Sequence, residues 1–157
     1  MRIFENLEEK LPSNAIAIGF FDGMHRGHKA VIRKAVDEFG GGVITFKNHP
    51  KIELGEQISL LFSLENRLKA IEQLGAEFIV VLDFNDMKNL TAAEFITVLA
   101  SVGVEKIISG EDARVGKDRL KIADICKKSS IKHVFVPIIY ENGEKISSTK
   151  MRENSNK

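Results

Sequence analysis

The sequence predicts an α/β fold in which a parallel sheet of about five strands carries helices on both faces. Short apolar runs of strand length alternate with longer segments of helical periodicity, and the alternation repeats about five times along the chain. The 157 residues and the 43% apolar composition suit one ordinary domain. Residues 1–157 are therefore expected to form a single domain, without a linker or an internal repeat.

The first strand and the first helix are predicted in the N-terminal third of the chain. Residues 15–21 read AIAIGFF, an apolar run suited to a strand that is buried on both faces. Residues 28–39 then carry apolar side chains at helical spacing, and the three glycines at 40–42 end that helix. The second strand is expected at residues 43–46.

The next helix is predicted over residues 63–75. Ser63 is placed to cap its first turn, and Gly75 is placed to end it. Its apolar positions form one stripe, made of Leu64, Leu68, Ile71 and Leu74. The run FIVVLDF at residues 78–84 follows as the third strand.

The segment 91–103 carries the strongest helix signals of the chain. Thr91 and Glu94 have the spacing of a capping box, and Gly103 stands where a left-handed C-terminal residue is expected. The remaining expected elements follow in chain order: a strand at 106–110, a helix at 118–129, a strand at 132–137, a turn at 142–143 and a short helix beginning near 146.

Charge and targeting signals exclude several classes of partner. The 23 basic and 22 acidic residues nearly cancel, so neither nucleic acid nor a polyanionic surface is expected as a partner. No apolar run approaches the roughly 20 residues of a membrane span, and the N-terminus lacks the core of a signal peptide. Cys126 is the only cysteine and is expected to pack within a helix. These features predict a cytoplasmic protein.

The stretch GFFDGMHRGH, residues 19–28, is the main candidate site. It follows the first strand and runs into the first helix, where a parallel sheet collects its ligand. The Asp22–Gly23 pair indicates a turn, and a helix start favours an anion. His25 and His28 are therefore expected to converge on one small volume.

Three interpretations of the two histidines are open from the residues alone. They could be surface residues on a polar turn, or zinc ligands, although no third ligand stands at a characteristic spacing. Phosphate binding is the third interpretation. It alone accounts for the glycines, the helix start and the imidazoles together.

Several segments together carry a family resemblance. GFFDGMHRGH resembles the signature of the HxGH nucleotidyltransferase superfamily, which has a Rossmann-like fold. TFKNHP at residues 45–50, the segments LENRLKAIEQLGAEFIVVLDF and LTAAEFI, and ISSTKMR at 146–152 resemble the bacterial FAD synthetase (FMN adenylyltransferase) domain. The resemblance spans residues 15–152, and it implies transfer of AMP from ATP to FMN, which gives FAD and pyrophosphate.

The resemblance also implies roles for residues on the nucleotide side. His25 and His28 match the histidines that contact the triphosphate, and Arg152 matches an arginine that offsets its charge. The loop around the nucleotide corresponds to Gly19, Phe20, Asp22 and Gly23. The closing motif, which would hold the β and γ phosphates, corresponds to Ser148 and Thr149 with Arg152. An ordinary turn at Asp22 and an ordinary N-cap at Ser148 are the alternatives.

On the acceptor side the resemblance points to His49, Pro50 and Asp112. Here the sequence also departs from the family, because Ala113 and Val115 occupy positions where the family commonly has phenylalanines. An aromatic ring is one source of affinity for a flat ligand, so a weaker affinity for flavin is expected.

ATP and FMN are thus the expected substrates, with Mg²⁺ held mainly by the phosphates. The bacterial enzymes usually continue into a riboflavin kinase domain, whereas this chain ends at Lys157, so no kinase activity is expected. Whether a separate protein supplies riboflavin kinase is left open. Two alternatives stay open: an adenylyl- or cytidylyltransferase for another phosphate acceptor, and a non-catalytic flavin- or nucleotide-binding module.

Overall fold

A six-stranded sheet forms the centre of the molecule. The computed structural model describes residues 1–47, 63–111, 113–137, 140–141 and 144–145. Neighbouring strands of the sheet all run parallel, in the order β1-β4-β3-β2-β5-β8. The strands are β1 (Arg2–Phe4), β2 (Ala15–Ile18), β3 (Gly42–Phe46), β4 (Phe78–Leu82), β5 (Lys106–Gly110) and β8 (Lys132–Val136). The predicted parallel α/β sheet is confirmed, with one strand more than expected.

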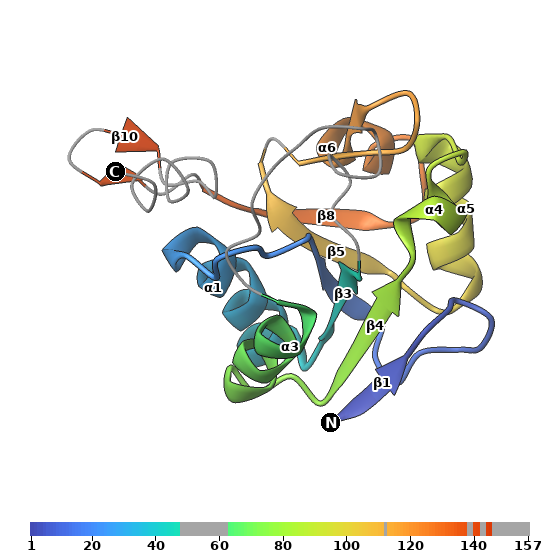
Figure 1. Ribbon diagram of the computed structural model, residues 1–157. Coiled ribbons are helices and arrows are strands. Elements are labelled where there is room, and N and C mark those ends of the chain that lie inside the picture. Colours follow the sequence, from blue (N-terminus) through green and yellow to red (C-terminus); the bar gives the residue numbers. More distant parts are fainter. Residues whose placement is uncertain (48–62, 112, 138–139, 142–143, 146–157) are drawn as a thin grey trace.

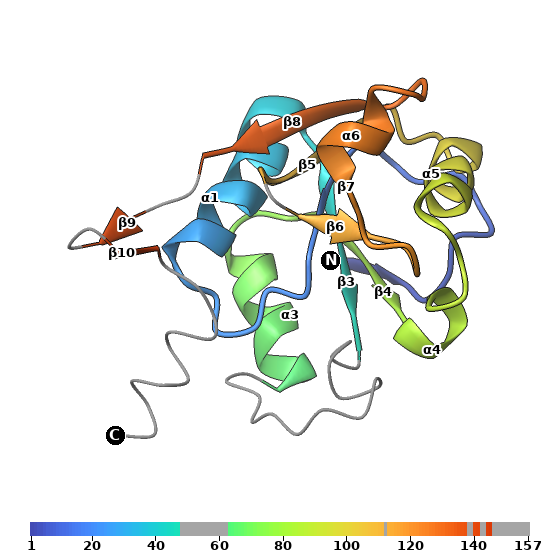
Figure 2. The ribbon, with the colours of Figure 1, turned by 90° about the horizontal axis from the view of Figure 1, so that it is seen from above.

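Helices cover both faces of this sheet. In Figures 1 and 2, α1 and α3 lie on one face, and α5 and α6 lie on the other. The helices are α1 (Arg26–Arg33), which continues into a π-helical turn η1 (Lys34–Glu38), α3 (Leu64–Gln73), α4 (Phe84–Met87), α5 (Ala92–Ser101) and α6 (Ile122–Cys126). Two antiparallel hairpins complete the described elements: β6 (Arg114–Val115) with β7 (Leu120–Lys121), and β9 (Tyr140–Glu141) with β10 (Glu144–Lys145).

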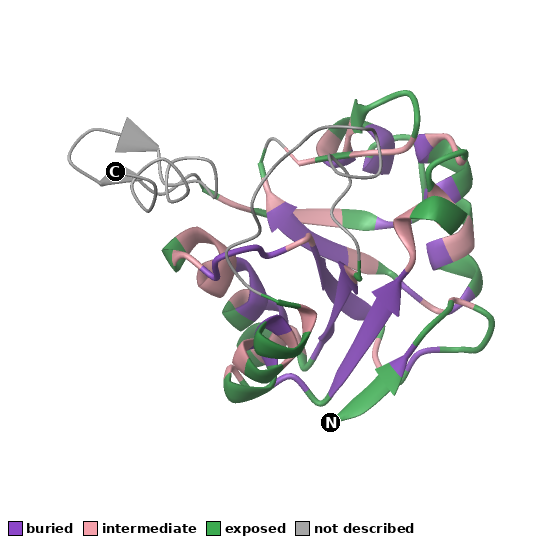
Figure 3. Ribbon diagram, viewed as in Figure 1, coloured by how far each residue is buried: buried purple, intermediate pink, exposed green. Residues whose placement is uncertain are grey.

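The sheet separates two apolar clusters. On one face, Val43 and other strand residues pack with Ile32 of α1 and Ile71 of α3. On the other face, Ile44 and its neighbours pack with Leu99 of α5. Figure 3 shows the central strands buried along most of their length, as their continuous apolar sequences require. Each helical layer therefore has its own half of the core.

The predicted helix signals act as expected. The Ser63 hydroxyl accepts a hydrogen bond from the Asn66 amide at 3.1 Å. The Thr91 and Glu94 side chains form a complete capping box. Gly103 has a φ of 92°, the left-handed conformation expected at a helix end. Local sequence signals were therefore sufficient to locate α3 and α5.

Strand β1 is absent from the prediction. It has only three residues, of which Phe4 alone is buried, so it shows neither a strand-length apolar run nor a clear alternation. Its pairing partner is β4, with Arg2 opposite Phe78. A strand that depends on a partner so distant in sequence leaves almost no local signal.

The helix predicted at residues 118–129 is much shorter in the structure. α6 spans only Ile122–Cys126. Asp118 instead binds a backbone amide of α5, and Arg119 has a φ of 55°, which interrupts helical geometry. Residues 120–121 pair with β6 as strand β7. The charged turn before α6 is therefore part of a hairpin.

Cys126 packs in the core as expected, with 5% of its surface exposed. Burial raises the pKa of its thiol, which makes it unreactive. Among the residues that the structure describes, no helix is long and apolar enough to cross a membrane.

Candidate functional site

The turn at residues 19–25 follows β2 at the point where the strand order reverses. From β2 the chain adds β3 and β4 on one side, and β5 and β8 lie on the other. In open parallel sheets such a switch point, at the carboxyl ends of the strands, is where ligands bind. The turn therefore lies at the favoured ligand position of this fold.

The backbone of this turn is strained. Phe21 and Met24 have φ values of 59° and 45°, which residues other than glycine rarely adopt, and Gly23 has a φ of 83°. The side chains of Phe21 and Met24 are nearly buried, at 4% exposure each, and they hold the turn against the α1 and α3 side of the core. Strain that the surrounding packing enforces is common at binding sites.

The two histidines meet at the start of α1. His25 is the N-cap, and its Nδ1 accepts a hydrogen bond from the His28 amide at 3.2 Å. The two imidazole rings stack with centroids 3.6 Å apart, and the His28 and Phe21 rings form a T-shaped pair with centroids 5.5 Å apart. The expected convergence of the two rings is confirmed.

The cap also determines the proton position on His25. Because Nδ1 accepts a hydrogen bond, the neutral ring carries its proton on Nε2, which is then a hydrogen-bond donor. Burial lowers the pKa of His25 below its ordinary value of 6.5. At neutral pH this residue is therefore a neutral donor at the start of α1.

Folding stability should fall as the pH drops below about 6.5. Burial lowers the pKa of both His25 and His133 in the folded protein, so the unfolded chain binds protons more readily below 6.5. Stability is full above that value and decreases towards the lowered pKa values. Urea unfolding at pH 7.5 and 5.5 measures this loss. The double variant His25→Asn/His133→Asn should show a smaller loss, and an equal loss would contradict the assignment.

Several predicted residues lie in the same turn. Gly19 donates its amide to Ile44 O of β3 at 3.1 Å, and a Cβ there would come within 3.0 Å of the Phe21 ring. Asp22 is buried, with 2% exposure, and adjoins Gly23. Six predicted site residues fall outside the described residues: His49, Pro50, Asp112, Ser148, Thr149 and Arg152.

A buried arginine, absent from the sequence prediction, lies under the turn. Arg67 of α3 is fully buried, and its Nη1 donates to Phe20 O at 2.9 Å, Thr45 Oγ1 at 3.1 Å and Phe46 O at 3.0 Å. Its position between Leu64 and Leu68, on the apolar stripe of α3, is a signal that sequence reasoning could have used. A charged residue on such a stripe needs buried partners.

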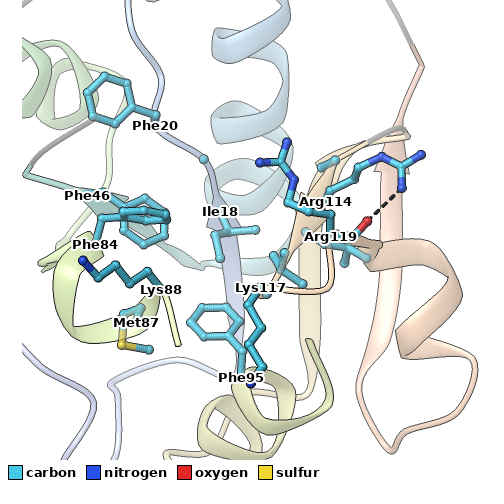
Figure 4. A pocket seen from close by; sticks show the side chains of 15 residues that line it. Ile18, Phe20, Phe46, Phe84, Met87, Lys88, Phe95, Arg114, Lys117 and Arg119 are labelled. Atoms are coloured by element: carbon cyan, nitrogen blue, oxygen red, sulfur yellow. Dashed lines mark hydrogen bonds between the residues drawn. The ribbon is translucent and has the colours of Figure 1, made fainter. Parts of the chain in front are cut away.

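An apolar pocket of about 360 Å³ opens beside the turn. This volume is within the range of about 300–1,000 Å³ that is typical of small-molecule sites. In Figure 4, Phe46 and Phe84 lie on one side of the pocket, and Arg114 and Arg119 lie on the other. Its described lining is Ile18, Gly19, Phe20, Phe46, Phe84, Met87, Lys88, Phe95, Ala113, Arg114, Val115, Gly116, Lys117, Arg119 and Ile122.

The chemistry of the pocket is aromatic and basic. Four described lining residues are phenylalanines, which suit a flat apolar ligand, and four are lysine or arginine. None of the described lining residues is acidic. Three of the cations, and both Ala113 and Val115, belong to the segment around the β6–β7 hairpin. The pocket therefore favours a ligand that combines a flat ring with negative charge.

The β6–β7 hairpin is tied to the start of α5. The Asp118 carboxylate accepts a hydrogen bond from the Ala92 amide at 2.9 Å, and the Lys117 amide donates to Leu90 O at 2.8 Å. Gly116 has a φ of 80° at this contact. These bonds fix one side of the pocket.

The turn and the pocket use opposite faces of the sheet. The turn continues into α1 and packs with Phe21 and Met24 on the α1 and α3 face. The pocket lining packs on the other face, through Ile18, Phe95 and Ile122. The two regions meet at Gly19 and Phe20, where β2 ends. A ligand that lies across the end of β2 would contact both helical layers.

Comparison with known families gives one match across most of the chain. The family model described as FAD synthetase matches residues 7–150. A bifunctional riboflavin kinase/FMN adenylyltransferase of Bacillus subtilis is 31% identical over 159 residues, which cover 93% of this chain and 50% of that protein. A FAD synthetase of Listeria monocytogenes is 28% identical over 152 residues, which cover 87% of this chain and 61% of that protein. The chain thus spans about half of the bifunctional relative.

Solved structures show the same fold. A Streptococcus pneumoniae protein described as a macrolide-efflux protein matches with a TM-score of 0.81 and 27% identity, over 97% of this chain and 56% of that one. A pantothenate synthetase from Thermus thermophilus matches with a TM-score of 0.62 and 14% identity, over 98% of this chain and 70% of that one. At this identity the second likeness concerns the fold alone.

Proposed function

Because the chain belongs to the FAD synthetase family, we propose that it transfers the AMP group of ATP to FMN and releases FAD and pyrophosphate. One observation carries the proposal. A strained turn with two stacked imidazoles adjoins an aromatic, basic pocket at the switch point of a parallel sheet. The turn suits a triphosphate, and the pocket suits the ring of a flavin.

On the nucleotide side, the imidazoles and the helix start hold the phosphates. The Nε2–H of His25 and the ring of His28 stabilise the charge that develops as pyrophosphate leaves. In this proposal the loop of Gly19, Phe20, Asp22 and Gly23 surrounds the nucleotide. The closing motif contributes the hydroxyls of Ser148 and Thr149 and the guanidinium of Arg152.

The reaction needs no covalent intermediate with the protein. A phosphate oxygen of FMN attacks the α phosphorus of ATP, so that a new P–O bond forms while the bond between the α phosphorus and its bridging oxygen to the β phosphate breaks. The electron pair of that bond leaves with pyrophosphate. The FMN phosphate is already an anion at neutral pH, so catalysis consists of placing two anions in line and offsetting their charge.

Mg²⁺ is proposed to be bound through the phosphates, whose charge it would offset. Among the described residues no group of three or more histidine, cysteine or acidic side chains could hold a metal ion.

On the acceptor side, the pocket holds the flavin ring. Phe46, Phe84 and Phe95 offer flat apolar contacts, and the basic residues of the hairpin attract the electron-rich edge of the ring or its phosphate. In this proposal His49, Pro50 and Asp112 border the flavin and its phosphate.

Restoring aromatic rings in the pocket should tighten flavin binding. Ala113 and Val115 both line the pocket, so the double variant Ala113→Phe/Val115→Phe adds two rings to its surface. A several-fold lower Kd for FMN is expected, since aromatic pairs add about 0.5–1.5 kcal/mol each. Quenching of flavin fluorescence measures this Kd. An unchanged Kd would place these positions away from the bound flavin.

The proposed reaction is tested by chromatography of purified protein with ATP, Mg²⁺ and FMN. FAD and pyrophosphate should appear in equal amounts. Parallel reactions contain CTP instead of ATP, or pantetheine phosphate, nicotinamide mononucleotide or glycerol phosphate instead of FMN. A different adenylylated or cytidylylated product would retain the phosphate site and overturn the flavin assignment. ATP and FMN binding without any product would show a binding module instead.

A further inference from the structure

Arg67 joins the ends of two strands beneath the site. It comes from α3, yet its Nη1 reaches Phe20 O beyond the end of β2 and Phe46 O at the end of β3. Its guanidinium carbon also lies 3.9 Å from the centroid of the Phe20 ring. Both Phe20 and Phe46 line the pocket, whereas Arg67 does not. The arginine therefore supports the pocket from outside.

The hydrogen bonds that Arg67 donates satisfy backbone carbonyls at and beyond the ends of the strands. β2 ends at Ile18, so the carbonyl of Phe20 lies beyond its ladder. That carbonyl accepts from Arg67 at 2.9 Å and from the Thr45 hydroxyl at 3.0 Å. This carbonyl is partly buried, and a carbonyl withdrawn from water needs such partners, so these two side chains determine where Phe20 lies relative to β3.

The positive charge of Arg67 also acts on the 19–25 turn. Burial lowers its pKa to about 10, while the charge of buried Asp22 acts in the opposite direction. The guanidinium is therefore protonated at neutral pH, surrounded by carbonyl oxygens, an aromatic face and a nearby carboxylate. Asp22 lies in the turn that leads to His25. One cation thus interacts with both the turn and the pocket.

We propose that Arg67 is a positioning residue that fixes Phe20, and through Phe20 aligns the acceptor pocket with the phosphate-binding turn. The inference rests on the proposed function for its choice of substrates. It predicts that Arg67 affects the affinity for the acceptor and the rate of transfer, although its fully buried side chain lies outside the pocket lining.

The first test is Arg67→Lys, which keeps the charge and removes the planar fork. The KM for FMN should rise roughly tenfold or more, on the scale of losing hydrogen bonds to a charged group, and kcat should also fall. The KM for ATP should also rise, because Phe20 and Asp22, on which Arg67 acts, belong to the loop that is proposed to surround the nucleotide. A purely structural role would reduce the active fraction and thermal stability and leave the KM for FMN unchanged.

Two further variants control this test. Thr45→Val removes one partner of Arg67 at almost constant volume, and it should give a smaller rise in the KM for FMN. Arg2→Lys is the matched control, because Arg2 also lies over a phenylalanine ring, Phe4 at 4.7 Å, in strand β1 at the sheet edge. Its kinetics should equal those of the unchanged protein. A rise in the KM for FMN in Arg2→Lys equal to that in Arg67→Lys would overturn the inference.

A double-mutant cycle tests whether Arg67 acts through Phe20. The effects of Arg67→Lys and Phe20→Leu on the KM for FMN should be strongly non-additive, because both disturb the same contact. Additive effects would mean that Arg67 acts elsewhere, and they would overturn the proposal.

Hydrogen exchange gives a readout that needs no substrate. In Arg67→Lys the Gly19 amide and its neighbours in the turn should exchange faster, while amides of α5 should keep their protection. If the unchanged protein neither binds FMN nor forms FAD, the proposed function fails, and the exchange result still decides the role of Arg67. If the turn amides of Arg67→Lys exchanged as slowly as those of the unchanged protein, that role would be overturned whatever the substrate.

Discussion

The variant His28→Ala is expected to lose roughly 100-fold or more in turnover, on the scale of removing one transition-state donor. His28 stands in the first turn of α1, with its ring stacked on His25 at 3.6 Å and against Phe21. In the proposed reaction it stabilises charge on the phosphates as pyrophosphate leaves, an interaction that strengthens in the transition state. The loss should therefore appear mainly in kcat.

FAD formation at saturating ATP and FMN measures this effect. The control is His133→Asn, since His133 lies on β8, half-buried, and bonds to Ser109 Oγ at 2.7 Å. That variant should keep nearly normal turnover. Circular dichroism verifies that both variants are folded. Near-normal turnover in His28→Ala would refute its catalytic assignment.

The variant Gly116→Ala is expected to lower both stability and acceptor affinity. A Cβ at this position would lie 2.2 Å from Ala92 N and 2.6 Å from Asp118 Oδ1, the two atoms of one hydrogen bond that ties the hairpin to α5. Alanine at a φ of 80° is also strained by about 1–2 kcal/mol. Strain and clash together should destabilise the protein by about 2 kcal/mol or more. The KM for FMN should rise because the hairpin carries one side of the pocket.

Gly40→Ala separates strain from clash. Gly40 also has a positive φ, 60°, but nothing lies within 4 Å of the position that a Cβ would take there. The variant Gly40→Ala should therefore lower the free energy of unfolding by only about 1–2 kcal/mol, the cost of the left-handed conformation, and leave the KM for FMN unchanged. Urea unfolding and steady-state kinetics compare the two. Equal stability losses in both variants would show that the contact with α5 does not matter.

Local sequence signals predicted most of the sheet and two helices well. Continuous apolar runs gave β2, β3, β4 and β5, because strands buried on both faces contain few polar residues. Caps located α3 and α5, because a cap is a contact between residues three apart. β1 was missed because it depends on a partner distant in sequence, and the β6–β7 hairpin was missed because strands of two residues are too short to show a periodic pattern.

The candidate site likewise has features that local sequence signals predict and features that they do not. The convergence of His25 and His28 followed from their spacing at a helix start. The strain at Phe21 and Met24 and the apolar pocket had no local signal, since both come from packing between elements. Arg67 had a local signal, its place on an apolar stripe, but its partners are Phe20, just beyond β2, and Phe46 at the end of β3, both distant in sequence.

The two faces of the sheet supply separate halves of the site, and this separation has an evolutionary consequence. The strained turn belongs to the layer of α1 and α3, while the pocket belongs to the layer of α5 and the hairpin. Substitutions in the second layer can alter the ligand ring that is accepted without disturbing the packing under the turn. Under the proposed function, a lineage built on this scaffold can therefore diversify its acceptors while its nucleotide chemistry stays constant. Phe20 is then the point where the two halves constrain each other.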